Sequence, residues 1–352
     1  ILGAGTAGTM MLNKLHHELD KEEWEITIVD QYKTHYYQPG FLFIPFGIYS
    51  KKDVVKPKYD FFPPGVNVIF SPIDKIVGEE NKVLLDDGQV LNYDFLIIAT
   101  GTETRPSETE GLQDKLWYKD IFDFYTVEGA VALHKRFKDW EGGKLVMAIP
   151  ELPYKCPVAP IEFVCLAEAY FAERGMRDKV EISYVTLMSG AFTKPVASKV
   201  LGDLLEEKNI EVVSDFYMSH VDNENKKIVS YDEREVDFDI LTIVPVNMGS
   251  DMIERSGLGD DMNYVPTDKH TLQSKQFENI FVIGDASNIP TSKAGSVAHF
   301  AAEILTENIL AAMEGREMPA KFDGHANCYI ETGYGKGALI DFNYETEPLP
   351  GT

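Results

Sequence analysis

The chain opens on a glycine-rich turn, and this turn restricts what the chain can fold into more than any other feature. The run ILGAGTAGTMMLNKL places Gly3, Gly5 and Gly8 between a short apolar strand and a predicted helix. The first glycine permits a tight turn, the second lets a phosphate approach the backbone, and the third lets the helix pack closely on the sheet. The first helical amides, near Thr6 and Ala7, then face the phosphates. The motif therefore predicts a dinucleotide-binding unit.

An acidic residue stands where such a unit needs one. The next predicted strand, WEITIVD, ends in Asp30, which lies 22 residues after Gly8. In dinucleotide-binding folds an acid at this position accepts hydrogen bonds from ribose hydroxyls. A glycine turn without a ligand is the plain alternative, but the order of strand, turn, helix, strand and acid favours a nucleotide site.

The rest of the chain alternates apolar strands with helical segments, which is typical of parallel sheets covered on both faces. The run DDGQV predicts a β-hairpin, and a second α/β unit begins near Lys144 with KLVMAIP. Buried strands resume at DILTIVP and NIFVIGD. We predict an α/β fold of two Rossmann-like domains, the second inserted in the first. The expected division is 1–104 with 241–320, then 105–240, then a short C-terminal segment, 321–352.

Composition excludes several classes of function. Lys and Arg total 33 against 57 acidic residues, a formal charge of −24, so the chain lacks the basic surface that nucleic acids require. Its three cysteines form no CxxC pair, so we expect neither a disulfide framework nor a metal site. No stretch approaches the roughly 20 apolar residues of a membrane helix. Because the chain begins without Met inside a predicted strand, we expect further residues before Ile1, with room for a targeting segment.

Two later motifs indicate which dinucleotide binds. Ala99, Thr100 and Gly101 close the strand DFLIIATG, and Gly284 and Asp285 follow the strand in NIFVIGDAS. With the N-terminal glycines, and in this order, they resemble the landmarks of two-dinucleotide-binding flavoproteins with a glutathione-reductase-like fold. The resemblance implies FAD at the first site, with the aspartate of the late motif contacting its ribityl or phosphate part.

The second unit lacks the corresponding glycine motif. The strand KLVMAIP ends in Pro150 and is followed by ELPYKCPVAPIE, which adds prolines at 153, 157 and 160. Proline removes amide donors and fixes φ, so this loop cannot form the usual pyrophosphate cradle. We therefore expect that the NAD(P)H site has been lost and that the electrons come from another donor.

Two of the three cysteines occupy unusual surroundings. Cys156 lies in this proline-rich loop just before a predicted helix, where the helix dipole favours a thiolate, and Glu162 follows six residues later. Cys328 lies 172 residues further on, in the run GHANCYIETGYGKG, whose glycines suggest close approach of the backbone to a ligand. Cys165, four residues after Ile161 on the helix, is typical of a small buried core residue.

The segments KCPVAPIE and ANCYIETGYGKGALIDF resemble the two cysteine segments of sulfide:quinone oxidoreductases and the related flavocytochrome c sulfide dehydrogenases. In that family the two cysteines meet at the flavin and are bridged by a disulfide or a short sulfur chain. The resemblance therefore implies that Cys156 and Cys328 form such a pair. THYYQPGFLFIPFG, residues 34–47, resembles the family's early flavin-contacting segment and places Gln38 and Pro39 near the flavin.

Several of these residues also have plainer interpretations. Glu162 fits a proton acceptor near the sulfur site, or simply an acid favoured by the helix dipole. Lys293 fits a cation that faces flavin or quinone, but a solvated surface lysine is the favoured interpretation. The apolar residues of FLFIPFG line a flavin pocket or belong to the ordinary core.

These observations predict an FAD-dependent oxidoreductase that oxidises sulfide, polysulfide or sulfane sulfur through Cys156 and Cys328 and passes electrons to a quinone. No cysteine precedes Cys156, so we expect non-covalent FAD. Quinone-using relatives continue into amphipathic helices, so peripheral attachment to the cytoplasmic face of a membrane requires a tail beyond Thr352. A cytoplasmic protein with another acceptor is the alternative, and a homo-oligomer is compatible with both. The rival functions are a type II NADH:quinone oxidoreductase-like enzyme and a redox-sensing or sulfur-carrying flavoprotein without turnover.

Overall fold

The computed structural model describes residues 1–348 and confirms the predicted α/β fold. The first domain is built on parallel strand pairs: β1 with β4, and β8 with β19. Leu2 joins them through parallel bridges to Val29 and Ile98. Elements of this domain include α1 (Thr6–Glu18), β1 (Thr27–Asp30), β2 (Thr34–Tyr36), β3 (Val55–Pro57), β4 (Asn67–Phe70), β8 (Leu96–Ile98), α5 (Asp251–Arg255), β19 (Ile280–Val282) and α6 (Gly295–Met313).

The two faces of this sheet are covered differently. Helices α1 and α6 lie side by side and bury apolar side chains such as Met11 and Leu305 against the sheet residues Ile97 and Phe281. On the other side packs the antiparallel sheet of β5 (Ile73–Val77), β6 (Lys82–Leu85) and β7 (Val90–Asn92). The predicted DDGQV hairpin is therefore confirmed as the β6–β7 turn. The near-continuous apolar character of β8 and β19 follows from burial on both faces.

The second domain contains one parallel sheet in the order β10-β17-β11-β12-β13. Successive side chains of β11 point to opposite faces of this sheet. Leu145 and Met147 pack on the face that the helices cover, whereas Val146 and Ala148 pack on the face covered by a three-stranded antiparallel sheet. The elements are β10 (Ile121–Phe122), α2 (Val127–Asp139), β11 (Gly143–Ile149), α3 (Ala159–Glu173), β12 (Val180–Thr186), α4 (Pro195–Glu207), β13 (Ile210–Val213), β14 (Met218–Asp222), β15 (Lys227–Ser230), β16 (Glu235–Asp237) and β17 (Ile240–Ile243).

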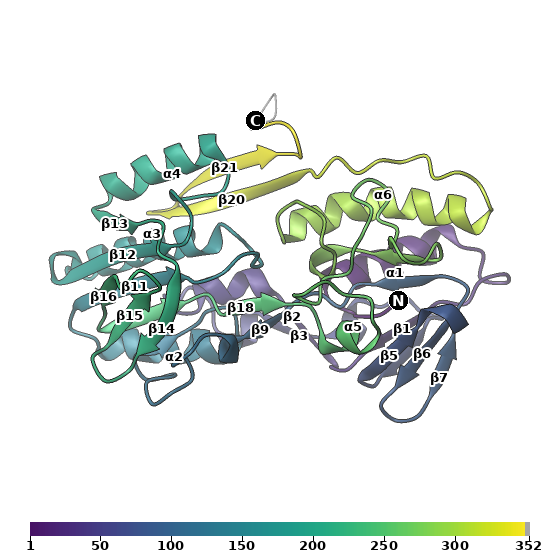
Figure 1. Cartoon of the computed structure of the whole chain (residues 1–352), viewed down its shortest axis with the longest axis horizontal. Helices are drawn as coiled ribbons and strands as arrows, with labels where there is room; N and C mark the ends of the chain where they lie inside the picture. The colour runs from purple at the N-terminus through teal and green to yellow at the C-terminus, as the bar shows by residue number, and fades with distance from the viewer. Residues whose placement is uncertain (349–352) are drawn as a thin grey trace.

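One expected domain boundary is misplaced. Residue 241 lies inside β17, which pairs with β10 and β11, so the second domain extends at least to Ile243. The chain then returns to the first domain through β18 (Val246–Met248), which pairs with β9 (Glu103–Arg105). The chain passes between the two domains twice, and these two short antiparallel strands bring the two connections side by side (Figure 1).

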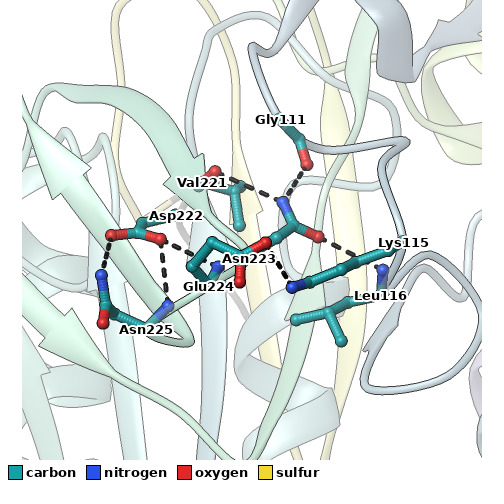
Figure 2. A network of polar contacts seen from close by, with 8 residues as sticks. All are labelled: Gly111, Lys115, Leu116, Val221, Asp222, Asn223, Glu224 and Asn225. Carbon is teal, nitrogen blue, oxygen red and sulfur yellow. Dashed lines mark hydrogen bonds and ion pairs between the residues drawn. The ribbon is translucent and has the colours of Figure 1, made fainter.

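A polar network fastens the β14–β15 turn to the segment that enters the second domain (Figure 2). The side chain of Asn223 donates to the carbonyl of Gly111 at 2.7 Å and accepts from the amide of Leu116 at 3.2 Å. Asp222 accepts hydrogen bonds from the turn that follows it. The entering segment is therefore held against the small sheet by side chains that satisfy its backbone groups.

The C-terminal segment is a hairpin of β20 (Ala326–Gly333) and β21 (Lys336–Phe342). After α6 the chain leaves the first domain, and the hairpin lies along α3 and α4 of the second domain (Figure 1). Cys328 is thereby carried to the helix that follows the Cys156 loop. Within residues 1–348, no helix combines the length and apolar character needed to cross a membrane.

Candidate functional site

The N-terminal glycine turn has the geometry of a phosphate cradle. A Cβ on Gly8 would lie 1.9 Å from the carbonyl oxygen of Gly3, and one on Gly3, whose φ is +92°, would lie 2.4 Å from the carbonyl oxygen of Ala99. The backbone of the turn, the start of α1 and the ATG motif therefore lie in direct contact, with no room for a side chain between them. A Cβ on Gly5 would meet no atom within 4 Å, so the space above this residue is open to a ligand.

Two buried hydroxyls beside this opening lack hydrogen-bond partners. The Oγ1 atoms of Thr100 and Thr102 are buried, and neither has a partner within residues 1–348. Unpaired buried polar groups are costly, which indicates that a bound molecule supplies the missing partner. Thr102 was not among the residues predicted from the sequence, although it follows the ATG motif directly. The open glycine turn and these hydroxyls fit a dinucleotide such as FAD.

Asp30 lies beside the glycine turn, where it was expected, and already has partners there. Its Oδ2 accepts a hydrogen bond from the amide of Ala4 at 2.7 Å and lies 2.5 Å from Nζ of Lys58. Lys58 is buried, which is rare for a lysine without an ion pair. The pair braces the turn, and the contact of Asp30 with a ribose stays a prediction. No local motif distinguished Lys58 from the neighbouring exposed lysines.

The late motif, Gly284 and Asp285, lies beside the N-terminal glycine turn and the ATG motif at the same edge of the sheet. Gly284 adopts a φ of +71°, and a Cβ there would lie 3.0 Å from that of Ala7. Asp285 follows in a short 3-10 turn, and burial raises the pKa of its carboxyl although Lys293 and Lys155 oppose that shift. The three motifs quoted from the sequence are therefore neighbours in space.

The solvated position favoured for Lys293 is wrong, because this side chain is buried. Its Nζ donates to the carbonyl oxygens of Asp285 at 2.7 Å and Ser287 at 2.9 Å, and it lies 3.7 Å from the ring centroid of Tyr264. Burial lowers the pKa of this ammonium to about 8. Lysine is tolerated here because two carbonyls and an aromatic face replace its water.

Lys293 also anchors the cysteine loop. Its carbonyl oxygen accepts a hydrogen bond from the amide of Cys156 at 2.7 Å, and Lys155 forms a parallel bridge with it. Cys156 adopts a φ of +53°, an uncommon conformation that persists only where the surroundings impose it. The loop that replaces the second nucleotide cradle is therefore fastened to the late FAD motif.

The expectation that the helix dipole favours a Cys156 thiolate is not met. Burial raises the pKa of Cys156 well above its ordinary value, and the neighbouring charges of Glu162 and Cys328 raise it further. Burial and Glu162 likewise raise the pKa of Cys328 to about 12. These effects outweigh the stabilisation available at a helix N-terminus. Both thiols are free in the structure, and each is partly buried against the same core cluster.

Glu162 lies between the two cysteine segments. It is in the first turn of α3, is only 6% exposed, and its Oε1 accepts a hydrogen bond from the amide of Glu331 on β20 at 2.9 Å. Burial raises the pKa of its carboxyl to about 7. A group that titrates near neutrality, beside two thiols, can take up or release a proton during turnover. The contact with Glu331 joins residues 169 positions apart and had no local signature.

The other cysteine and several apolar residues of the early segment belong to the core. Cys165 is fully buried, as expected. Phe41, Leu42 and Ile44 pack into the large cluster beneath α2 and α3, so they are core residues. Gln38 and Pro39, at the start of the 3-10 helix of this segment, are exposed, and their contact with flavin stays a prediction.

In related folds a nicotinamide dinucleotide binds at one edge of the second sheet. In this protein the residues at that edge do not favour such a ligand. A cavity of about 1120 Å³ opens at the carboxyl ends of β11, β12 and β13. Its lining includes Pro150 after β11 and four carboxylates beside Arg234. The carboxylates are those of Glu108, Glu151, Asp215 and Asp232. This negative lining repels a pyrophosphate, in agreement with the missing glycine motif.

Fold and site together define a two-dinucleotide-binding flavoprotein oxidoreductase, and comparisons with known proteins give the family. Residues 130–245 match the family model described as the central part of the flavoprotein chain of sulfide dehydrogenase (flavocytochrome c). The chain is 30% identical to the mitochondrial sulfide:quinone oxidoreductase of Dictyostelium discoideum over 99% of its own length and 78% of the relative's. The chain belongs to the sulfide:quinone oxidoreductase family.

Solved structures agree on the fold. The sulfide:quinone oxidoreductase of Aquifex aeolicus superposes with a TM-score of 0.80 at 19% identity, covering 97% of this chain and 86% of that one. A chain in the mitochondrial ATP synthase of Tetrahymena thermophila gives a TM-score of 0.83 at 18% identity, covering 97% and 85%. At these identities the similarity concerns the fold alone.

Proposed function

We propose that the protein is an FAD-dependent sulfide:quinone oxidoreductase in which Cys156 and Cys328 are the redox pair. The observation that carries the proposal is Glu162, whose charge acts on both thiols and whose carboxylate binds the strand that bears Cys328. Segments that are remote in sequence thus supply two sulfur atoms and a proton carrier to one site. Membership of the family supports the same activity.

FAD is the cofactor that the cradle fits best. Its pyrophosphate would lie over Gly5, and the hydroxyls of Thr100 and Thr102 would donate to it or accept from it. When bound, it accepts two electrons from the sulfur site and passes them to the acceptor. The protein contributes Lys293, whose hydrogen bonds tie the cysteine loop to the late motif and so would hold Cys156 on the side of the molecule where FAD is expected.

The sulfur step is an exchange at a bridge between the two cysteines. Hydrosulfide attacks one sulfur of the bridge, so that a new S–S bond forms while the old one breaks. A persulfide remains on Cys156 and a thiolate is released on Cys328. Overall the hydrosulfide sulfur loses two electrons and one proton, and a quinone gains two electrons and two protons. The oxidised sulfur leaves as polysulfide or passes to a carrier.

Glu162 is proposed to accept the proton that the sulfur loses. Its ionised form is needed, so flavin reduction by sulfide should accelerate as pH rises through about 7. The family resemblance supports a quinone as the electron acceptor and peripheral attachment to a membrane, and a homo-oligomer is compatible with both.

The identity of the electron donor can be tested directly. Anaerobic sulfide should bleach the flavin absorbance of the purified protein within the mixing time of a manual experiment, whereas NADH at the same concentration should not. The reason is the acidic, proline-containing edge that replaces the second nucleotide cradle. Rapid bleaching by NADH would instead favour the type II NADH:quinone oxidoreductase activity.

The role of Glu162 gives a pH-dependent prediction. Glu162→Gln should slow flavin reduction by sulfide about 10²-fold and abolish the part of the pH profile that depends on the carboxyl. Hydrosulfide titrates near neutrality too, so the variant profile isolates the substrate's contribution. Glu173→Gln, which changes an exposed glutamate at the end of the same helix, is the matched control.

The same substitution has a predicted effect on stability. Because burial raises the folded-state pKa of Glu162, the folded protein loses stability as pH rises from about 4.5 through about 7. Glu162→Gln should therefore be more stable than the wild type at pH 8, by roughly 2–3 kcal/mol, and nearly equal to it at pH 4. Equal unfolding free energies at pH 8 would contradict the buried, titrating carboxyl.

A further inference from the structure

Helix α3 holds the C-terminal hairpin through two buried carboxylates. Glu162 accepts from the amide of Glu331, and Glu168 accepts from the hydroxyl of Tyr334 at 2.7 Å. The two acids are six residues apart, about 9 Å along the helix. One carboxylate therefore binds strand β20 and the other binds the tip of the hairpin. Cys328 lies on β20 as well, three residues before Glu331.

The hairpin tip is shaped to reach this second carboxylate. Gly333, Tyr334 and Gly335 all have positive φ, of 81°, 58° and 66°. A tyrosine in this region is a genuine outlier that the surroundings must stabilise. At Gly333 a Cβ would lie 2.9 Å from both the Cβ of Ala169 and the carbonyl oxygen of Cys165, so the tip touches α3 directly.

A lysine from the end of α4 closes the arrangement. The Nζ of Lys208 lies 2.9 Å from Oε2 of Glu168, and both side chains are nearly buried, at 12% and 10% exposed. The same Nζ lies 4.9 Å from the ring centroid of Tyr334. Tyr334, Glu168 and Lys208 thus form a three-residue latch between the hairpin tip, α3 and α4. Hydrogen bonds to a charged, poorly solvated acceptor are among the stronger ones in proteins.

We infer that this latch is a positioning device that sets where Cys328 lies relative to Cys156. Cys156 is already fixed at the N-terminal end of α3 by its bond to Lys293. Cys328 is held by its pairing with Ile340 on β21 and by packing against the core cluster, so its position follows how the hairpin as a whole docks on the helix. A direct disulfide needs Cα atoms within about 7 Å, so a small drift of β20 would prevent closure. This inference rests on the proposed function of the cysteine pair.

The test measures closure of the bridge independently of sulfide turnover. The reduced holoprotein is treated with diamide, which accepts two electrons and two protons from the thiols, and the peptide joining Cys156 and Cys328 is followed by mass spectrometry. Tyr334→Phe removes the hydroxyl but keeps the ring over Lys208. It should slow closure roughly tenfold or more while the flavin spectrum and melting temperature remain close to the wild type.

A second variant perturbs the same contact by another route. Gly333→Ala should also slow closure, because its methyl group pushes the tip away from Ala169. Tyr231→Phe is the chemical control, since Tyr231 is 78% exposed and directly follows β15 in the small antiparallel sheet of the second domain. Closure rates within twofold of the wild type in both Tyr334→Phe and Gly333→Ala would overturn the latch. If the latch variants slow closure but sulfide does not bleach the wild-type flavin, the latch stands and the proposed function fails.

Discussion

Cys328→Ser is expected to yield a folded, flavin-loaded protein whose absorbance no longer bleaches when sulfide is added without oxygen. A serine hydroxyl can neither form the sulfur bridge nor leave as a stabilised thiolate, so the sulfur step has no route. The rate of flavin reduction should fall by roughly 10³-fold or more, as when a nucleophile is removed from an enzyme. Cys156→Ser should have the same effect, because the two sulfur atoms act as one unit.

The third cysteine provides the matched control for this experiment. Cys165 is fully buried on the same helix as Glu162, and its backbone contacts the hairpin at Gly333. Cys165→Ser should cost about 1–3 kcal/mol of stability, because it buries a hydroxyl, yet sulfide should still bleach the flavin. Wild-type rates in both Cys156→Ser and Cys328→Ser would end the sulfur hypothesis.

Turnover separates the enzyme from a flavoprotein that only senses or carries sulfur. The wild type should oxidise sulfide continuously when a soluble quinone analogue is present. A single bleaching event without steady-state turnover would favour the non-catalytic alternative. The cysteine variants should be inactive in both assays.

The second large effect concerns the N-terminal cradle, where two glycine substitutions should fail for different reasons. Gly8→Ala places a Cβ 1.9 Å from the carbonyl oxygen of Gly3, so the helix cannot pack on the strand. We expect a strongly destabilised protein, by several kcal/mol, that is purified without flavin. Gly5→Ala meets no protein atom, so the fold should persist.

The Gly5→Ala variant therefore isolates the ligand. Its methyl group projects into the open space where the pyrophosphate is expected, and FAD affinity should fall tenfold or more, at least about 1.4 kcal/mol. Gly202→Ala on α4, where a Cβ also meets nothing, should instead gain roughly 0.5–1 kcal/mol of stability. Unchanged FAD affinity in Gly5→Ala would contradict this placement of the pyrophosphate.

Local patterns predicted much of the architecture because their physical causes are local. The alternation of buried strands and helices, the DDGQV turn and the glycine spacing depend on side chains within one or two elements. The absence of a second glycine motif was equally visible, and four prolines in eleven residues predict that no run of amide donors forms there. The misplaced boundary at residue 241 has the opposite cause, because an apolar strand fits either sheet and only pairing assigns it.

The glycine turn by itself predicted a dinucleotide site at the start of the chain, because close backbone approach is a property of three residues. Only the tertiary structure decided the surroundings of the two cysteines that we propose as the redox pair. The burial of Lys293, the pKa values of both thiols and the contact of Glu162 with Glu331 all arise between segments far apart in sequence. Desolvation depends on everything that surrounds a group, and no pattern of neighbours along the chain contains that information.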